Sequence, residues 1–280
     1  AVDDHLMRTT HVVRGDEWLP SLPFHIQLFR ALGFSLPKYV HIGPLMKMDG
    51  ASKRKLSKRK DPELALDFYN AEGYPVPSVL EYLMTLLNSN FEDWRLANPT
   101  APMGDFQFTT KKMGNSGSLF DIDKLKDVSK NTISVMSADQ VYDEVTAWAK
   151  DFDPQLYTLL TADEQKAKAI FAIGRGGAKP RKDIAIWSEV KDYVAFFYEE
   201  LFTAASEYPE NVSTQDALDI LTQYRSLYSP ADDGETWFNK VRELGESLGF
   251  AAKPKDYKKN PDQYKGHVGD VSQVIRLAIT

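Results

Sequence analysis

The sequence Lys53-Arg54-Lys55-Leu56-Ser57-Lys58-Arg59-Lys60 places six cationic side chains within eight residues. It directly follows Met48-Asp49-Gly50-Ala51-Ser52, which the glycine marks as a loop. The whole chain has a formal net charge of -6, so the residues outside the cationic run carry -12. A focused positive patch in an acidic chain favours one anionic ligand at one place, whereas a uniformly basic chain would favour general binding to nucleic acid. On charge alone, a solvated surface loop or a nuclear-import-like segment explains the run equally well.

The residues before this basic run indicate an α/β unit. Residues 10–15 (Thr-His-Val-Val-Arg-Gly) favour a short strand, because β-branched residues precede a glycine. A helix is expected next, with Pro20 and Pro23 in its first turn and Gly33 as its C-cap. Residues 39–42 (Tyr-Val-His-Ile) are typical of a second strand. Ligands of open α/β sheets bind at the loops that follow such strands, so the basic run lies where a ligand site is expected.

Beyond Lys60 the pattern is almost entirely helical. Asp61 and Pro62 are expected to act as the N-cap and first residue of the next helix. Residues 97–118 contain Pro99, Pro102 and three glycines, which predict an irregular loop. Apolar spacing predicts helices over residues 61–73, 78–88, 139–152, 184–202, 213–224 and 235–248. The expected fold class is therefore mostly α, with a small α/β part near the N-terminus.

Composition is that of a globular chain, with 42% hydrophobic and 26% charged residues. There are no cysteines, which excludes disulfides, thiolate metal sites and cysteine nucleophiles. No apolar run approaches the roughly 20 residues of a membrane-spanning helix, and no signal-peptide layout is present at the N-terminus. We expect a cytoplasmic chain without a membrane partner. Because it begins with Ala1 and its last helical pattern runs to Thr280, we also expect a fragment.

Two short segments carry residue types suited to chemistry on an anion. Lys55, Ser57 and Lys58 form a Lys-x-Ser-Lys pattern that offers two ammonium groups and a hydroxyl to a triphosphate. Mobile lysines of this kind can follow negative charge onto a leaving pyrophosphate. Upstream, the guanidinium of Arg14 could pair bidentately with a carboxylate. The cluster of Arg14, Asp16 and Glu17 at a strand end also suits a structural ion pair, and both readings stay open.

Together these segments resemble the bacterial-type glutamyl-tRNA synthetases, a family of class I aminoacyl-tRNA synthetases. The run from Lys55 to Arg59 looks like the KMSKS signature of that family, with Leu56 in place of Met and Arg59 in place of the second Ser. The other matching stretches are residues 3–7, 10–21, 68–74, 120–125 and 264–271. The similarity covers nearly the whole chain in order, although residues 85–118 and 150–255 match loosely.

The resemblance implies a two-step reaction. Glutamate and ATP form glutamyl-adenylate, which is then transferred to the terminal adenosine of tRNA-Glu. It also implies three parts: residues 1–60, the C-terminal remnant of a class I Rossmann-like α/β catalytic core with the KMSKS loop; residues 61–131, a helical stem-contact region; and residues 132–280, an all-α anticodon-binding domain, truncated at its C-terminus. The implied partners are tRNA-Glu, ATP and glutamate, and a monomer is expected.

Site residues follow from the same resemblance. Arg14 would contact the glutamate substrate, and Glu17 and Met46 would lie along the adenylate. The ATP loop would consist of Lys55, Leu56, Ser57, Lys58 and Arg59. Within it, Lys58 and Lys55 are the predicted catalytic residues, with Lys58 at the pyrophosphate. Mg²⁺ is expected only as part of the ATP complex, and no zinc or other protein-held metal is expected in this chain.

One family motif is missing. The HIGH motif of these enzymes precedes the segment that resembles residues 3–7, so this chain starts too late to contain it. His41-Ile42-Gly43-Pro44 is not its counterpart, because it stands immediately before the basic run, where the family has a strand of similar local sequence. We therefore expect residues 1–280 alone to be unable to activate glutamate.

A second basic loop, Gly174 to Lys182, is a candidate tRNA contact. Its glycines allow close approach and its cations, Arg175, Lys179, Arg181 and Lys182, could meet phosphates or unstacked bases. An ordinary helix-to-helix turn fits it equally well. Helical spacing favours core packing over base stacking for the aromatic residues Trp148, Trp187, Phe196, Phe197 and Trp237. The alternative functions are a non-catalytic helical RNA-binding or scaffold protein derived from a synthetase, and an import signal in the first basic run.

Overall fold

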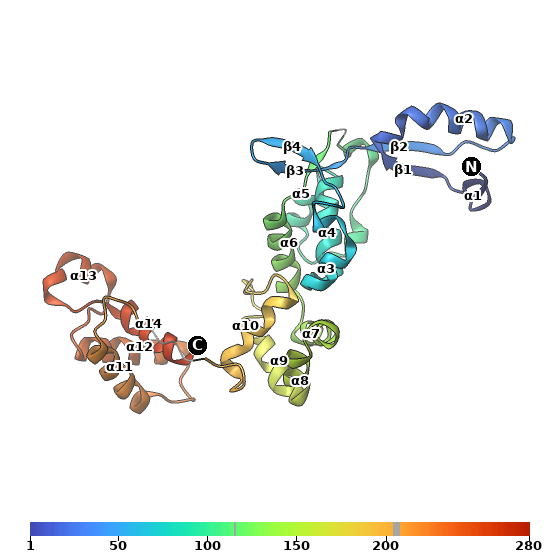
Figure 1. The fold of residues 1–280 in the computed structure, drawn as a ribbon. Helices are drawn as coiled ribbons and strands as arrows, with labels where there is room; N and C mark the ends of the chain where they lie inside the picture. The colour runs from blue at the N-terminus through green and yellow to red at the C-terminus, as the bar shows by residue number, and fades with distance from the viewer. Residues whose placement is uncertain (115, 204–207) are drawn as a thin grey trace. The chain divides into compact units, whose positions relative to one another are not determined.

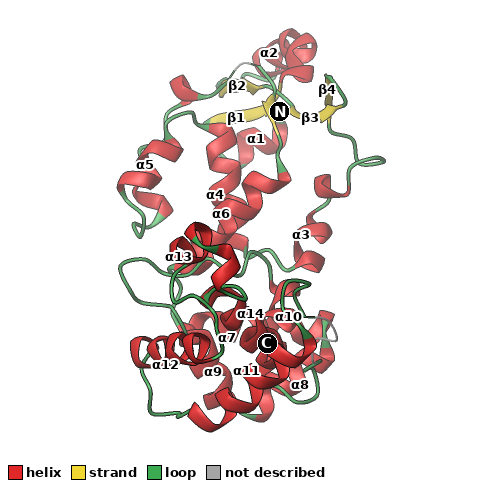
Figure 2. Cartoon of the chain, turned by 90° about the vertical axis from the view of Figure 1, so that its left-hand side faces the viewer, coloured by secondary structure: helices red, strands yellow, loops and turns green. Residues whose placement is uncertain are grey.

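A computed structural model describes residues 1–114, 116–203 and 208–280 (Figure 1). The chain forms two compact units, residues 1–193 and 194–280. Strands occur in the first unit and the rest is helix and loop, as Figure 2 shows by colour. The predicted mostly α fold class is confirmed at this level. The boundaries expected at residues 60 and 131 separate functional parts rather than compact units, and they stay predictions.

The first unit begins with the predicted strand, helix and strand. The elements are α1 (Val2–Leu6), β1 (His11–Gly15), a 3₁₀ helix (Asp16–Ser21), α2 (Leu22–Ala31) and β2 (Lys38–Ile42). Strands β1 and β2 pair in parallel, with Val13 opposite Val40 and Gly15 opposite Ile42. Gly33 follows the end of α2 with φ of 71°, a conformation that glycine adopts without strain. This parallel pair places Arg14 and the residues after it at the carboxyl end of β1.

The basic run begins as a strand, which the sequence did not predict. Strands β3 (Leu45–Asp49) and β4 (Ser52–Lys55) form an antiparallel hairpin, and β5 (Ser118–Leu119) pairs with β3 in parallel. The expected loop of residues 48–52 shrinks to a turn at Gly50, with φ of 60°, and Ala51. Charged residues in β4 lack the apolar alternation by which strands are predicted.

Helices α3 to α6 build the core behind the hairpin. They are α3 (Leu66–Glu72), α4 (Val76–Leu87), α5 (Phe91–Ala97) and α6 (Ile122–Ser134), and α4 packs against α6. The buried cluster includes Tyr82, Phe120, Leu125 and, from the basic run, Leu56. The predicted helix over 61–73 is split into a 3₁₀ turn (Pro62–Leu64) and α3, because Ala65 between them has extended backbone angles.

The predicted irregular loop is present after α5. It holds two 3₁₀ turns, Met103–Asp105 and Thr110–Lys112, and Asn88 secures it by donating a hydrogen bond to the carbonyl of Thr109 at 2.9 Å. Residue 115 within the predicted loop lies outside the described residues.

Three helices complete most of the first unit. They are α7 (Ala138–Phe152), α8 (Pro154–Ala162) and α9 (Glu164–Ala172). A capping box of Ser137 and Gln140 starts α7, and Val145, Leu156 and Phe171 are buried where the three helices meet. The helix predicted over 139–152 is confirmed.

The helix predicted over 184–202 is wrong. This segment contains only a 3₁₀ turn (Trp187–Glu189), α10 (Val190–Val194) and a second 3₁₀ turn (Ala195–Phe197). Residues 184–187 (Ile-Ala-Ile-Trp) are four consecutive buried residues, which no single helix face could bury. The backbone of these residues forms hydrogen bonds to other parts of the unit. The N–H of Trp187 donates to the carbonyl of Gly73 at 2.8 Å, and the hydroxyl of Ser129 donates to the carbonyl of Ala185 at 2.5 Å.

The second unit is a helical bundle. Its helices are α11 (Thr214–Leu227), α12 (Gly234–Ser247), α13 (Pro254–Lys259) and α14 (Val268–Ile279). Helices α11 and α12 both pack on α14, around a core that contains Ile220, Val241 and Val271. The helices predicted over 213–224 and 235–248 are confirmed. Across the described residues, no helix combines the length and the apolar character needed to cross a lipid bilayer.

Candidate functional site

The basic loop, defined here as residues 55–60, leaves β4 at a well-anchored point. The backbone N–H of Leu56 donates to the carbonyl of Leu45 at 2.9 Å. The Leu56 side chain is only 4% exposed and belongs to the same buried cluster as Tyr74 and Phe120. Leu56 therefore anchors the loop to the core, and the polar residues around it face outward.

Arg54, just before the loop, is engaged inside the protein. Its Nη1 and Nη2 donate to the two carboxylate oxygens of Asp61 at 2.6 and 2.7 Å, and its Nε donates to Asp49 at 2.9 Å. Hydrogen bonds from Arg54, then from the backbone of Ser57, hold the pKa of Asp61 well below its usual range. One of the six cations of the run is therefore structural.

The remaining cations of the run differ in how they are paired. Lys55 lies with its Nζ 3.3 Å from Oε1 of Glu17, and both side chains are about half exposed, so the pair is a weak one. Lys58, Arg59 and Lys60 are exposed, and none of them has an ion pair with a residue that the structure describes. Three cations at the tip of an anchored loop are thus available to an anion.

Glu17 is placed by the turn after β1. A Cβ on Gly15 would lie 2.1 Å from Oε2 of Glu17, so a larger residue at position 15 would displace this half-exposed, flexible carboxylate from its present place. The backbone N–H of Glu17 itself and then Lys55 lower the pKa of the Glu17 carboxyl. Met46, also predicted to lie at the site, stands opposite Lys55 in the hairpin. The structure therefore brings Glu17, Met46 and Lys55 together from β3, β4 and the turn after β1.

Arg14, at the end of β1, has an unused donor. Its Nε donates to Nε2 of His41 at 3.2 Å, and its guanidinium lies 5.2 Å from the ring centroid of Tyr39 and 5.6 Å from that of Trp18. The Nη2 atom is buried and has no hydrogen-bond partner among the described residues. A buried charged donor without a partner costs free energy unless a ligand supplies an acceptor. Arg14 is therefore poised for an anionic group.

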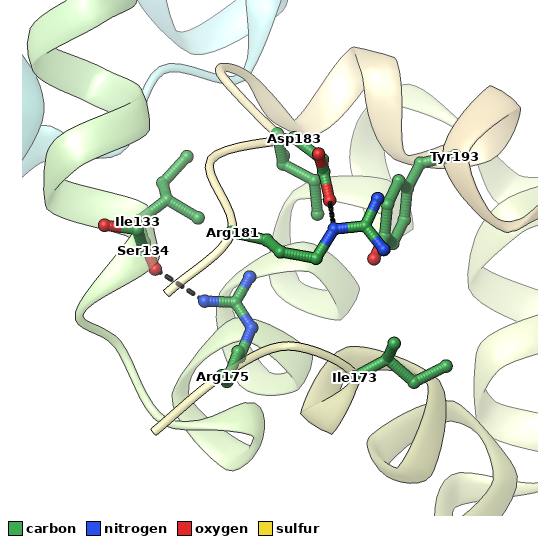
Figure 3. Close-up of a pocket in the computed structure, with 8 residues that line it drawn as sticks. Ile133, Ser134, Ile173, Arg175, Arg181, Asp183 and Tyr193 are labelled. Carbon is green, nitrogen blue, oxygen red and sulfur yellow. Dashed lines mark hydrogen bonds and ion pairs between the residues drawn. The ribbon is translucent and has the colours of Figure 1, made fainter. Parts of the chain in front are cut away.

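The second basic loop holds part of its charge internally. Arg175 is half-buried and donates from Nη1 to the carbonyl of Ile133 at 2.6 Å, and burial lowers its pKa (Figure 3). Arg181 pairs with Asp183 at 2.6 Å. The cavity between them is about 10 Å³, room for about one water molecule and no larger ligand. Lys179 and Lys182 are exposed and have no ion pair with a described residue.

Comparison with known proteins places the first part of the chain. Residues 1–127 match a family model described as tRNA synthetases class I (E and Q), catalytic domain. Over these residues the chain is similar to the catalytic domain of class I tRNA synthetases. The matched region contains Arg14, Glu17, the hairpin β3–β4 and the whole basic loop.

Curated relatives match the full length of the chain. The chain is 50% identical over 278 residues to a glutamate–tRNA ligase of Acetivibrio thermocellus, covering 99% of this chain and 51% of that protein. It is 50% identical over 285 residues to the glutamate–tRNA ligase of Clostridium beijerinckii, covering 100% of this chain and 52% of the relative. These relatives are ligase enzymes, and the chain spans about half of their length.

The fold is also similar to a solved structure. A crystal structure of a glutamate tRNA ligase from Elizabethkingia meningosepticum, in complex with its amino acid, aligns with a TM-score of 0.64 at 20% identity. The alignment covers 98% of this chain and 56% of that one. The synthetase resemblance inferred from short motifs therefore agrees with relatives matched over the chain's full length and with the fold.

Sequence reasoning missed the carboxylates that hold the basic loop. The sequence predicts Asp61 as a helix N-cap, yet its side chain makes no cap hydrogen bond and turns back to Arg54. Glu63, 7% exposed, pairs with Lys47 of β3. The available signal was two acidic residues immediately after a cationic run. Among the described residues, no group of three His, Asp or Glu side chains is arranged to hold a metal ion.

Proposed function

We propose that this chain is the part of a glutamate–tRNA ligase that carries the ATP loop and the tRNA-binding helices. The observation that carries the proposal is the 50% identity to glutamate–tRNA ligases over 99% of the chain. In the proposed reaction, a glutamate carboxylate oxygen attacks the α-phosphorus of ATP, and the bond to pyrophosphate breaks. The terminal adenosine hydroxyl of tRNA-Glu then attacks the carbonyl of glutamyl-adenylate and releases AMP.

The basic loop would act on the leaving pyrophosphate. Negative charge grows on the β- and γ-phosphates as the bond to the α-phosphorus breaks, and positioned cations stabilise that charge. Lys58 and Arg59 are exposed and have no internal ion pair among the described residues, whereas Lys55 has only a weak pair with Glu17. We assign the pyrophosphate contact to Lys58, with Lys55 beside it, and Mg²⁺ would arrive with ATP.

Arg14 would bind the glutamate substrate. Its buried, unpartnered Nη2 can donate to a carboxylate, and the Trp18 and Tyr39 rings lie beside the guanidinium. Glu17 and Met46, placed near Lys55, would lie along the adenylate.

The helical remainder would bind tRNA-Glu. We propose the stem contact for residues 61–131 and the anticodon contact for residues 132–280, in a monomeric enzyme of the cytoplasm. In the second basic loop, Lys179, Arg181 and Lys182 are the proposed contacts. Arg175, which is bonded to the end of α6, would hold the loop in place.

A test of activity separates the chain from the intact enzyme. In ATP–pyrophosphate exchange, residues 1–280 alone are expected to show no activity above background, since the half that carries HIGH is absent from them. The same residues joined to the first half of a glutamate–tRNA ligase are expected to give exchange that requires glutamate. Exchange by residues 1–280 alone would contradict the proposed division of the site, and no exchange by the joined protein would contradict the function.

The tRNA contact is tested by removing two exposed charges. Lys179→Ala combined with Lys182→Ala is expected to weaken tRNA-Glu binding several-fold and to reduce the slope of log affinity against log salt by about 1.4–1.8, because two phosphate contacts are lost. Filter binding of the purified chain at four salt concentrations measures both. Lys150→Ala, on the exposed side of α7, is the matched control and is expected to bind like the parent. Equal slopes for parent and double variant would remove the assignment.

A further inference from the structure

One buried carboxylate connects both ends of the basic loop. Asp61 is 2% exposed, and its oxygens accept two hydrogen bonds from Arg54, at the end of β4. Oδ2 also accepts the backbone N–H of Ser57 at 2.8 Å, inside the loop. The Asp61 side chain, which follows the loop, is thus bonded both to the strand before the loop and to the loop itself.

Backbone and charge contacts reinforce the same closure. The carbonyl of Ser57 accepts from the backbone N–H groups of Lys60 and Asp61 at 3.0 and 2.9 Å. From the neighbouring strand, Nζ of Lys47 lies 3.9 Å from Oδ1 of Asp61 and also pairs with Glu63. The hydrogen bonds that Asp61 accepts from Arg54 and Ser57 therefore hold the turn that contains Lys58 and Arg59.

We propose that Asp61 is a positioning residue for the ATP loop: through Arg54 and Ser57 it holds residues 55–60 in one conformation before any nucleotide binds. The catalytic part of this inference rests on the proposed function of the loop. Flexible lysines lose rotational freedom when they meet a phosphate, and a loop that is already ordered adds no backbone cost to that loss. The structure assigns Arg54 to this role rather than to the nucleotide, since each of its three guanidinium nitrogens donates to Asp49 or Asp61.

Loop order is measured directly by trypsin, which cleaves after the exposed Lys58 and Arg59. In native residues 1–280, Asp61→Asn is expected to raise the rate of cleavage within residues 58–60 by at least about tenfold, because cleavage follows the population of the open loop. Asp67→Asn, at an exposed position on α3, is the control and should cleave like the parent. Cleavage in residues 175–182, an exposed loop to which Asp61 makes no bond, serves as the internal reference and is expected to keep the parent rate.

A second variant covers the case in which Asp61→Asn does not fold. Arg54→Gln removes the bonds that Asp61 accepts from Arg54, on the partly exposed side of the pair, and is expected to open the loop although the Ser57 bond remains. Lys53→Gln removes a neighbouring exposed charge in the same strand and is expected to leave the loop closed. Parent-like cleavage of the loop in folded Asp61→Asn or Arg54→Gln would overturn the inference.

The effect on catalysis is measured in the joined enzyme, which is residues 1–280 joined to the first half of a glutamate–tRNA ligase. Asp61→Asn is expected to lower kcat of ATP–pyrophosphate exchange at least tenfold and to leave the KM for glutamate within twofold, because the loop lysines move whereas Arg14, bonded to His41, does not. A more open loop with unchanged kcat would also overturn the positioning role. If the unmutated joined enzyme gives no exchange, the proposed function fails, and the cleavage ratio still decides whether Asp61 orders the loop.

Discussion

Lys58→Ala in the joined enzyme is expected to lower kcat of ATP–pyrophosphate exchange by about 10²–10³-fold, the usual cost of removing one positioned donor to a developing negative charge. Lys58 is exposed at the tip of the basic loop and has no ion pair with a described residue, so its charge is free for the phosphates. The KM for glutamate should stay near that of the parent, since Lys58 acts on the leaving group.

The control for this variant lies in the same cationic run. Lys53→Ala removes one exposed positive charge from β4, outside the signature-like residues 55–59, and its kcat is expected to stay within about threefold of the parent because an exposed charge acts weakly at a distance. Steady-state exchange at saturating glutamate and varied ATP compares the two. Equal losses in both variants would show that the run acts only through its total charge, and Lys58 would lose its assigned role.

Tyr82→Ala is expected to lower the free energy of unfolding of the first unit by about 3–5 kcal/mol, the cost of removing a large aromatic side chain from a core. Tyr82 is 1% exposed in α4, and its ring meets Phe120 edge to face at 5.3 Å between centroids. Its hydroxyl also accepts the backbone N–H of Asp121 at 2.6 Å, at the start of α6. Leu56 belongs to the same cluster, so the anchor of the basic loop should weaken as well.

Tyr82→Phe separates the ring from the hydroxyl. It keeps the packed ring and removes one hydrogen-bond acceptor, for an expected loss of about 1 kcal/mol. Urea unfolding of residues 1–280, followed by circular dichroism and tryptophan fluorescence, measures both variants; the transition of the second unit is the internal reference. Similar losses for the two substitutions would mean that the hydroxyl, rather than the ring, carries the stability.

The parts of the fold that sequence predicted well are those with local signals. The strand before Gly15, the helix after Pro20 and the helix opened by Ser137 each combine an apolar period with a residue that starts or ends the element. Strand β4 and residues 184–187 lacked such signals. The first is charged at three of its four residues. The second is buried where Ser129 of α6 donates to the carbonyl of Ala185 and the carbonyl of Gly73, just after α3, accepts from Trp187.

The candidate site also has features that the sequence predicts and features that only the tertiary structure decides. The spacing Lys55-Leu56-Ser57-Lys58-Arg59 and its resemblance to a synthetase signature are properties of the sequence, and the role of this segment stays a prediction. Sequence alone could not separate the cations of the run, because charge at neighbouring positions looks alike before the chain folds. Burial of Asp61 against Arg54 and of Arg175 against the end of α6 decides which charges hold the protein together and which stay free for a ligand. A buried ion is stable only when its partners are in place, and those partners come from elsewhere in the fold.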